Sequence, residues 1–283
     1  NESTGTKAVF DLFSFFESNQ FHELIELLMN NLTILFVPIL NPDGALVYTR
    51  ENAHGIDLNR DAVDLSAKES QLLNAVLNDF KPDFCFNLHD QRTIFNVEGT
   101  SNPATISFLA PSVDEERTLT TSRKKTMSVI VAMNQLLQEI IPNQVGRYTD
   151  EFYPTATGDN FQKAGYHTIL VEAGHFKDDY DREEVRKFNF LAILQALDFI
   201  STTQHFDHYL PYFEIPNNEK RFFDVIYRNT LYENKIQDVA FQYHFKRIHH
   251  KLEKSLTLEK VGDLSNYLGH FEMNFDGNSF YLI

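Results

Sequence analysis

The chain has 283 residues, of which 42% are hydrophobic and 13% aromatic, a composition typical of a globular protein with one or two domains. Its net charge of −15 argues against a nucleic-acid binder, because neutralising phosphates requires a basic face. The single cysteine, Cys85, excludes an intramolecular disulfide and cysteine-based zinc sites. No apolar run approaches the roughly 18–20 residues of a membrane span, and no signal peptide is visible. The compartment, cytoplasmic or exported, and the oligomeric state stay open.

The first 200 residues alternate helical and strand-like segments. In chain order the pattern predicts helices over 8–19, 21–30, 66–79, 115–140 and 183–202, and strands over 33–39, 84–88, 105–110 and 168–171. The helix at 66–79 is expected to open with a capping box, because Ser66 is followed three residues later by Glu69.

Strands that alternate with helices imply βαβ crossovers. The predicted fold class is therefore α/β, with a mostly parallel mixed sheet and helices on both faces. After about residue 205 the pattern changes to strand-like runs at 222–228, 238–245 and 278–283, and Asp276-Gly277 predicts a hairpin turn. We expect a catalytic-type domain over 1–204 and a β-rich C-terminal appendage over 205–283.

The stretch from Asn41 to Asp61 carries the first functional signal. It opens with the turn string Asn41-Pro42-Asp43-Gly44, continues through Arg50, and ends in Asp57-Leu58-Asn59-Arg60-Asp61. It follows the predicted strand 33–39, and ligands bind at the C-terminal ends of strands in open α/β sheets. Because a guanidinium suits a carboxylate bidentately, the stretch predicts a carboxylate-binding loop.

Other ionisable residues are expected at the same edge of the sheet. His89 follows the predicted strand 84–88, Glu172 follows the strand 168–171, and Glu2 precedes the first helix. A hydrolytic zinc site needs imidazole and carboxylate ligands, an open position for water, and a separate base. His89 and Glu2 are candidate ligands, and Glu172 is the candidate base.

Several motifs occur in a fixed order along the chain: NPDG, R-x8-N-R in DLNRD, strand-LH, Y-x4-G-D and V-E-A-G. With this set, the sequence resembles the zinc metallocarboxypeptidases of the carboxypeptidase A type over residues 1 to about 200. That resemblance implies a bound Zn²⁺. Glu2 would be the glutamate of the family's His-x-x-Glu element, and His89 the later ligand. The histidine of that element is not in this sequence, and we expect His-Gly immediately before Asn1.

The resemblance also assigns roles to the arginines and the base. Asn59 and Arg60 would clamp the terminal carboxylate of the substrate, and Arg50 would stabilise the developing oxyanion. Glu172 would take a proton from the zinc-bound water and pass it to the leaving amine.

The remaining roles concern a tyrosine and the specificity pocket. The family's mobile tyrosine is matched best by Tyr153, with Tyr148 as a fallback. Asp159 lies where the family places its side-chain pocket, and an acid there would favour basic terminal residues. The alternative for Asp159 is a helix N-cap for residues 160–164.

The resulting functional prediction is a zinc-dependent hydrolase that removes a C-terminal amino acid from a peptide or small substrate with a free carboxylate. One alternative is an amidohydrolase of the aspartoacylase or succinylglutamate desuccinylase type, or a murein peptide hydrolase. Another is a non-catalytic, carboxylate-binding pseudopeptidase. With one of three ligands missing, the chain itself is expected to bind zinc poorly. His175 is predicted as a hydrogen-bond partner near Glu172, and His244, His249 and His250 as solvated surface.

Overall fold

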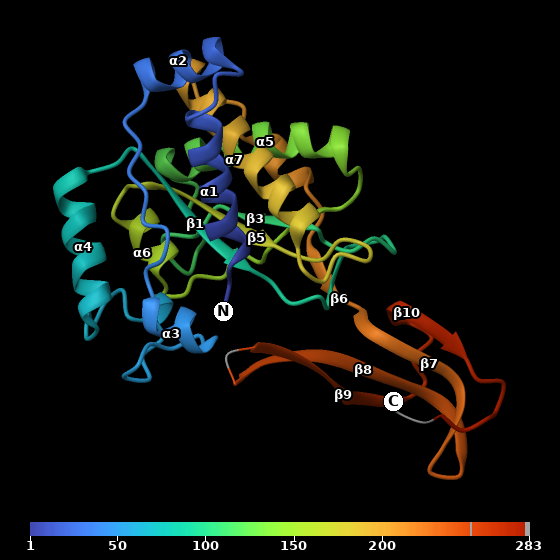
Figure 1. Ribbon diagram of the computed structural model, residues 1–283. Helices are drawn as coiled ribbons and strands as arrows, with labels where there is room; N and C mark the ends of the chain where they lie inside the picture. The colour runs from blue at the N-terminus through green and yellow to red at the C-terminus, as the bar shows by residue number, and fades with distance from the viewer. Residues whose placement is uncertain (250, 281–283) are drawn as a thin grey trace.

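A computed structural model describes residues 1–249 and 251–280 of the chain (Figure 1). Its helices are α1 (Thr4–Phe16), α2 (His22–Asn31), α3 (Pro42–Val47), α4 (Lys68–Phe80), α5 (Thr121–Ile140), α6 (Thr157–Lys163) and α7 (Glu183–Thr202), with 3₁₀ turns η1 (Leu58–Arg60) and η2 (Leu210–Glu214). Its strands are β1 (Phe84–Asp90), β2 (Phe95–Val97), β3 (Ile106–Leu109), β4 (Val145–Arg147), β5 (His167–Ala173), β6 (Asn218–Lys220), β7 (Phe222–Tyr232), β8 (Lys235–Ile248), β9 (Lys251–Gly262) and β10 (Leu268–Asn274). No helix among the described residues is both long and apolar enough to cross a membrane.

The first sheet has the strand order β1-β5-β3-β4. β1 runs parallel to β5 and β3 parallel to β4, whereas β3 and β5 are antiparallel, so the mostly parallel mixed sheet is confirmed. The register of β1 and β5 sets His89 directly beside Glu172. Two residues 83 positions apart in the sequence thus share one edge of the sheet.

Helices cover both faces of this sheet, as predicted. On one face α1 lies against β1 so closely that a Cβ added to Gly5 would be 2.5 Å from the Cβ of Leu88. On the other face Gly158 of α6 lies against Asn87, the strand neighbour of Leu88. Successive strand residues point to opposite faces, so α1 and α6 are on opposite sides.

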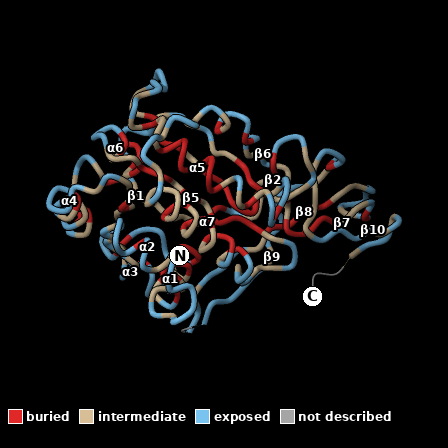
Figure 2. Tube along the Cα trace, turned by 90° about the horizontal axis from the view of Figure 1, so that it is seen from above, coloured by how far each residue is buried: buried red, intermediate tan, exposed pale blue. Residues whose placement is uncertain are grey.

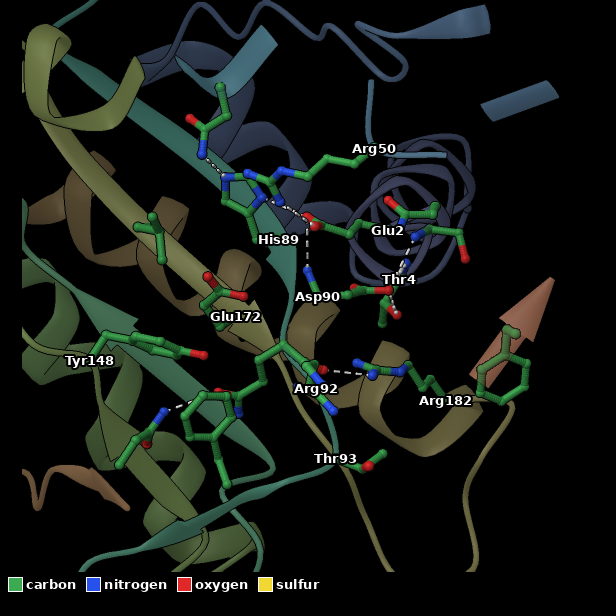
Figure 3. A pocket seen from close by; sticks show the side chains of 18 of the residues that line it. Glu2, Thr4, Arg50, His89, Asp90, Arg92, Thr93, Tyr148, Glu172 and Arg182 are labelled. Carbon is green, nitrogen blue, oxygen red and sulfur yellow. Dashed lines mark hydrogen bonds and ion pairs between the residues drawn. The ribbon is translucent and has the colours of Figure 1, made fainter. Parts of the chain in front are cut away.

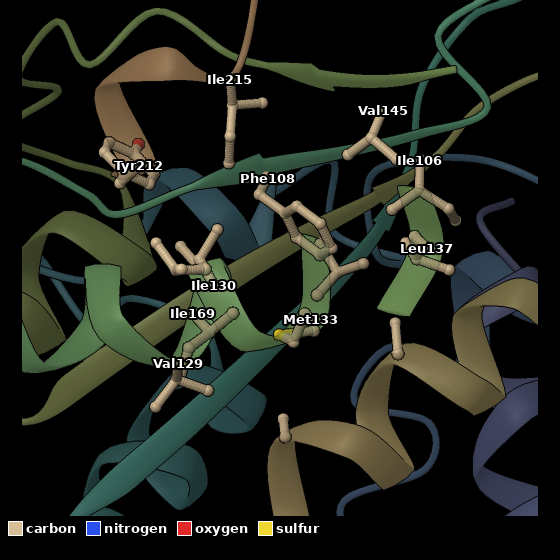
Figure 4. Close-up of a cluster of buried hydrophobic side chains, with 14 of the residues drawn as sticks. Ile106, Phe108, Val129, Ile130, Met133, Leu137, Val145, Ile169, Tyr212 and Ile215 are labelled. Atoms are coloured by element: carbon tan, nitrogen blue, oxygen red, sulfur yellow. The ribbon is translucent and has the colours of Figure 1, made fainter. Parts of the chain in front are cut away.

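The main core lies between the sheet, α5 and α7 (Figure 4). Its strand residues are mostly β-branched or aromatic, including Ile106, Phe108, Ile169 and Val171, which are all fully buried. Each such side chain stabilises the fold by about 1.5–3 kcal/mol relative to an exposed one. Figure 2 shows this buried zone under an exposed rim of loops and short helices. The ends of β1 and β5, which carry His89 and Glu172, are therefore positioned by this packed core.

The C-terminal region forms a second sheet with the order β10-β7-β8-β9, which confirms the predicted β-rich region. β7 and β8 extend the predicted runs, but β9 and β10 were not predicted. In the run 278–283, residues 278–280 form no strand and 281–283 lie outside the described residues. Asp276 and Gly277 do form a turn, with positive φ at both positions, and the Asn278 carbonyl that follows accepts a hydrogen bond from the Leu231 amide of β7.

Three local predictions were wrong. Residues 33–39 are extended but pair with no neighbouring strand within the described residues, and their odd-numbered side chains are exposed. The capping box does not form, because Ser66 donates to Asp61 instead and α4 begins two residues later, at Lys68. α5 begins at Thr121 rather than near 115, because Thr120 accepts a hydrogen bond from the Arg123 amide and caps the helix there.

Candidate active site

A cavity of about 1180 Å³ opens at the C-terminal ends of β1 and β5. All the predicted site residues line it, although they come from six separate segments of the chain: Glu2, Arg50, Asn59, Arg60, His89, Tyr153, Asp159 and Glu172. The structure therefore brings the predicted set together at one place.

The loop from Asn41 to Asp61 is shaped by its own polar side chains. Asn41 Oδ1 accepts a hydrogen bond from the Gly44 amide at 2.9 Å, so the turn string begins the short helix α3. Asn41 Nδ2 donates to the Arg50 carbonyl at 3.0 Å. Asp57 Oδ1 accepts from the Asn59 amide at 2.9 Å and caps η1. These bonds fix the backbone at Arg50 and Asn59, and both side chains face the cavity.

Glu2, His89 and Arg50 form a connected polar group (Figure 3). The Glu2 Oε2 atom is 2.6 Å from His89 Nδ1, and Glu2 Oε1 accepts from Arg50 Nη1 at 3.3 Å. Arg50 Nε also donates to Asp57 Oδ2 at 2.7 Å. Glu2 is held further by the Asp90 amide at 3.4 Å. The N-terminal segment is thereby fixed to the end of β1, 87 residues away.

The pKa values of this pair shift in opposite directions. Burial alone would raise the pKa of Glu2, but the hydrogen bond and charge of His89 and the charge of Arg50 outweigh it and lower the pKa. Burial alone would lower the pKa of His89, but the hydrogen bond and charge of Glu2 and the charge of Glu172 raise it. Each shift therefore favours the charged form of its group over the neutral one.

Glu172 lies beside His89 in the register and has no hydrogen-bond partner for its carboxyl group within the described residues. Burial raises the pKa of Glu172 to about 7, and the negative charges of Glu2 and Asp90 add to the effect against the opposing charges of His89 and Arg50. A carboxyl group with this pKa can exchange a proton near neutral pH, as a general base or acid must.

Asn59 and Arg60 lie at the loop side of the cavity. Asn59 Nδ2 is 3.4 Å from His89 Nε2, and Asn59 Oδ1 accepts from the Thr157 amide at 3.3 Å. Arg60 Nη1 donates to the Asn59 carbonyl at 3.0 Å, and its guanidinium lies 5.5 Å from the centre of the Tyr153 ring. Arg60 makes no ion pair with any described residue, so its guanidinium is available to donate hydrogen bonds to a ligand carboxylate.

The two candidate tyrosines differ in environment. Tyr153 is about half exposed, and its ring lies against Arg60. Tyr148 is buried deeper and lies on the same side of the cavity as Glu172 (Figure 3). Burial raises the pKa of Tyr148 far above its ordinary value, and the negative charges of Glu172 and Glu2 raise it further. Tyr148 is therefore a neutral hydroxyl close to the carboxylates, whereas Tyr153 belongs to the Arg60 side.

Asp159 lines the cavity but is engaged by the backbone, because its Oδ1 atom accepts from the Tyr153 amide at 3.0 Å. Burial raises the pKa of Asp159, and that hydrogen bond only partly offsets the effect. The N-cap alternative for residues 160–164 was wrong, since α6 begins at Thr157 with Ala156 at its N-cap position. Asp159 instead fixes the loop that carries Tyr153.

The donor set for a metal is incomplete. Glu2 Oε2 and His89 Nδ1 converge as one carboxylate and one imidazole ligand, the donor types that zinc prefers. Within residues 1–249 and 251–280, no group of three or more His, Cys, Asp or Glu residues could hold a metal ion. The pair fits part of a zinc site, and a third protein donor is not among the described residues.

Two features near the strand ends were not foreseen. The Arg182 guanidinium donates to the Ala173 carbonyl, and at 2.7 Å to the Gln91 carbonyl, so it ties the ends of β5 and β1 together. His175 was predicted as a hydrogen-bond partner near Glu172, but it is buried and packs in a tilted arrangement against the rings of His270 and Tyr180, with centroid distances of 4.0 and 4.7 Å. Nothing in the local sequence pattern distinguishes Arg182 from a surface arginine.

The C-terminal sheet also lines the cavity, through Asp224, Gln242, Tyr243, His244, Phe245 and Leu252. The prediction of solvated surface at His244 was incomplete, because His244 lies in the cavity wall and pairs with Glu259 at 3.1 Å. His249 is exposed, as predicted, and His250 lies outside the described residues. Local sequence carries no signal for this wall, which depends on the packing of two regions.

Comparisons with known proteins give a fold but no family. No family model and no curated protein matches the sequence. Among solved structures, the chain is similar to a candidate carboxypeptidase A from Shewanella denitrificans OS-217, with a TM-score of 0.51 and 15% sequence identity over 71% of this chain. The match covers 54% of that protein, so this chain spans about half its length. At this identity the likeness is one of fold, and the fold is carboxypeptidase-like.

Proposed function

We propose that the chain is a zinc-dependent hydrolase of the metallocarboxypeptidase type, which cleaves a C-terminal amino acid from a peptide. The observation that carries the proposal is the Glu172 carboxyl group, with its pKa raised to about 7, beside the Glu2–His89 pair in one cavity. The carboxypeptidase-like fold supports it, as does the Arg60 guanidinium in the same cavity, which makes no ion pair with any described residue.

Each residue has a role that its surroundings allow. The Arg60 guanidinium and the Asn59 amide hold the carboxylate of the terminal residue. Glu172 accepts a proton from the attacking water and passes it to the leaving amine. Arg50 offers positive charge where the carbonyl oxygen becomes negative, and such a donor typically contributes about 3–4 kcal/mol. A zinc ion held by Glu2 and His89 would supply Lewis-acid activation of water.

The test measures hydrolysis and zinc content together. Because two protein ligands hold zinc weakly, the buffer contains excess zinc. Under this condition we expect release of the C-terminal amino acid from short peptides and at most about one zinc bound per chain. Glu172→Gln should keep the metal and lower turnover by about 10²–10⁴-fold, because a general base is lost. The matched control is Glu151→Gln, an exposed glutamate outside the cavity. Unchanged turnover in Glu172→Gln would show that this residue is not the base.

A second candidate, a carboxylate-binding protein without catalysis, is favoured by one observation. The described residues offer only two converging metal donors, whereas catalytic zinc sites generally have three protein ligands. This candidate predicts that peptides with a free carboxylate bind, amidated peptides do not, and neither is cleaved at any zinc concentration. N-acylated amino acids in the same panel test the amidohydrolase alternative.

A further inference from the structure

The hairpin of β8 and β9 lies across the cavity from the ends of β1 and β5 (Figure 1). It contributes Tyr243, His244, Phe245 and Leu252 to the cavity wall. The cavity thus lies between the first sheet, whose strand ends carry His89 and Glu172, and the second sheet, which carries none of the candidate catalytic residues.

The hairpin is held at two places. In the middle of β8, Gln242 donates to the Thr93 hydroxyl at 2.5 Å and to the carboxylate of Asp224 on β7, which also accepts from the Tyr180 hydroxyl at 2.9 Å. Toward its tip, Arg247 donates to the Leu46 carbonyl of α3. The anchors Thr93 and Tyr180 lie on the loops that follow His89 and Glu172. The strand ends and the hairpin wall are therefore held in a defined relation.

Two apolar side chains of the wall are open to the cavity. Phe245 is 38% exposed and Leu252 is 50% exposed, although both line the cavity. Nearby, the Lys254 ammonium lies 4.2 Å from the centre of the Tyr243 ring and 4.9 Å from that of Tyr180. Exposed apolar surface that is continuous with a ligand cavity marks a contact area for the ligand.

The direction of a bound substrate decides which part of it meets this wall. Arg60 would hold the terminal carboxylate on the loop side, and cleavage would occur beside Glu172. Figure 3 shows a strand of the C-terminal sheet beyond Arg182, on the side of the cavity away from Tyr148 and Glu172. The residues upstream of the scissile bond would therefore extend toward the hairpin.

We propose that Phe245 and Leu252 form a subsite for an apolar side chain upstream of the scissile bond, so that the substrates are short peptides with apolar residues at that place. This subsite rests on the proposed function for the direction of the peptide. It requires no residue beyond those on the cavity wall.

The experiment measures binding to the Glu172→Gln protein, so that cleavage does not interfere. The probes are fluorescent tetrapeptides in matched pairs. The two peptides of a pair have the same C-terminal residue and differ only in the two residues before it, which are Leu-Leu or Ser-Ser. One pair ends in Lys and the other in Phe. In the Phe245→Ala/Leu252→Ala protein, we expect about tenfold weaker binding of the Leu-Leu peptides and unchanged binding of the Ser-Ser peptides. Phe245→Leu with Leu252→Met should restore most of the affinity.

A matched control removes the same side-chain types outside the cavity. Phe271 is 50% exposed and Leu258 is 42% exposed on the same sheet, and neither lines the cavity. The Phe271→Ala/Leu258→Ala protein should bind all peptides as before. Equal loss for Leu-Leu and Ser-Ser peptides, or an equal loss in the control protein, would overturn the subsite.

The outcomes separate this inference from the proposed function. Selective binding of Leu-Leu peptides that the protein never hydrolyses would overturn the hydrolase and keep the subsite. Hydrolysis with the same preference in the Phe245→Ala/Leu252→Ala protein would keep the hydrolase and overturn the subsite. Absence of binding by every peptide would overturn both.

Discussion

The two sheets of this molecule differ in how they are buried and in what they contribute. The first has strands of three to seven residues, and helices cover both of its faces. The second has strands of seven to fourteen residues, and its outer strand β9 is almost entirely exposed. The ionisable residues of the candidate site lie at strand ends, on loops or in the short helical segments η1 and α6 of the first region, whereas the second region contributes cavity wall.

This difference assigns distinct tasks to the two regions. Groups that exchange protons need fixed geometry and low solvent exposure, and the paired, partly buried ends of β1 and β5 provide both for His89 and Glu172. Contacts that select a substrate can come from a surface that tolerates substitution, such as the exposed hairpin of β8 and β9. Changes in the first region should therefore affect chemistry and carboxylate binding, and changes in the second should affect selection and docking.

After the loss of turnover expected of Glu172→Gln, the largest effect is expected at Arg60. Arg60→Ala should raise KM for peptides with a free carboxylate by about 10- to 100-fold, because a hydrogen bond to a charged group contributes about 1.5–3 kcal/mol. C-terminally amidated peptides should bind weakly to the unmodified protein, and no more weakly to the variant. The control is Arg221→Ala, a partly exposed arginine outside the cavity. The measurement is the steady-state KM for both peptides. An equal rise in KM for the amidated and the free peptide would contradict the role of Arg60 in binding the terminal carboxylate.

The next effect concerns the docking of the second sheet. Asp224 is buried, and its carboxylate accepts hydrogen bonds from the Tyr180 hydroxyl, the Gln242 amide and the Tyr243 backbone. Asp224→Ala leaves these donors without an acceptor and should lower the free energy of unfolding by about 2 kcal/mol, as measured in urea. Glu253→Ala, at an exposed position on β9, should change it by less than about 0.5 kcal/mol. Equal stability of both variants would mean that the sheet is docked by other contacts.

The sequence predicted the parts that depend on local pattern. The helix 183–202 forms as Glu183–Thr202, and the strands before His89 and Glu172 form where apolar runs predicted them. Residues 33–39 have the same apolar pattern but no neighbouring strand among the described residues, and periodicity cannot show whether a partner exists. The sequence pattern placed Glu2 and His89 at one edge of the sheet as candidate metal ligands, but it could not show that they are in direct contact, because 87 positions separate them. The cavity wall at Phe245 and Leu252 depends on the docking of two regions, which no local signal encodes.

The smallest effect is a pH dependence that belongs to the first sheet alone. The pKa of Glu172 is raised from the ordinary value of 4.5 to about 7 by burial. Between these pH values the folded protein holds a proton that the unfolded chain has lost, so this group makes the protein less stable as pH rises. In buffer with a chelator, the free energy of unfolding should fall between pH 5 and 7 by on the order of 1 kcal/mol more in the unmodified protein than in Glu172→Gln. The Glu172→Gln protein serves as the reference because the raised pKa of His89 also makes the free energy of unfolding fall with rising pH, and it does so in both proteins. Parallel curves for the two proteins would show that Glu172 is ionised in the fold at pH 5, and its role as a base active near neutral pH would then need another explanation.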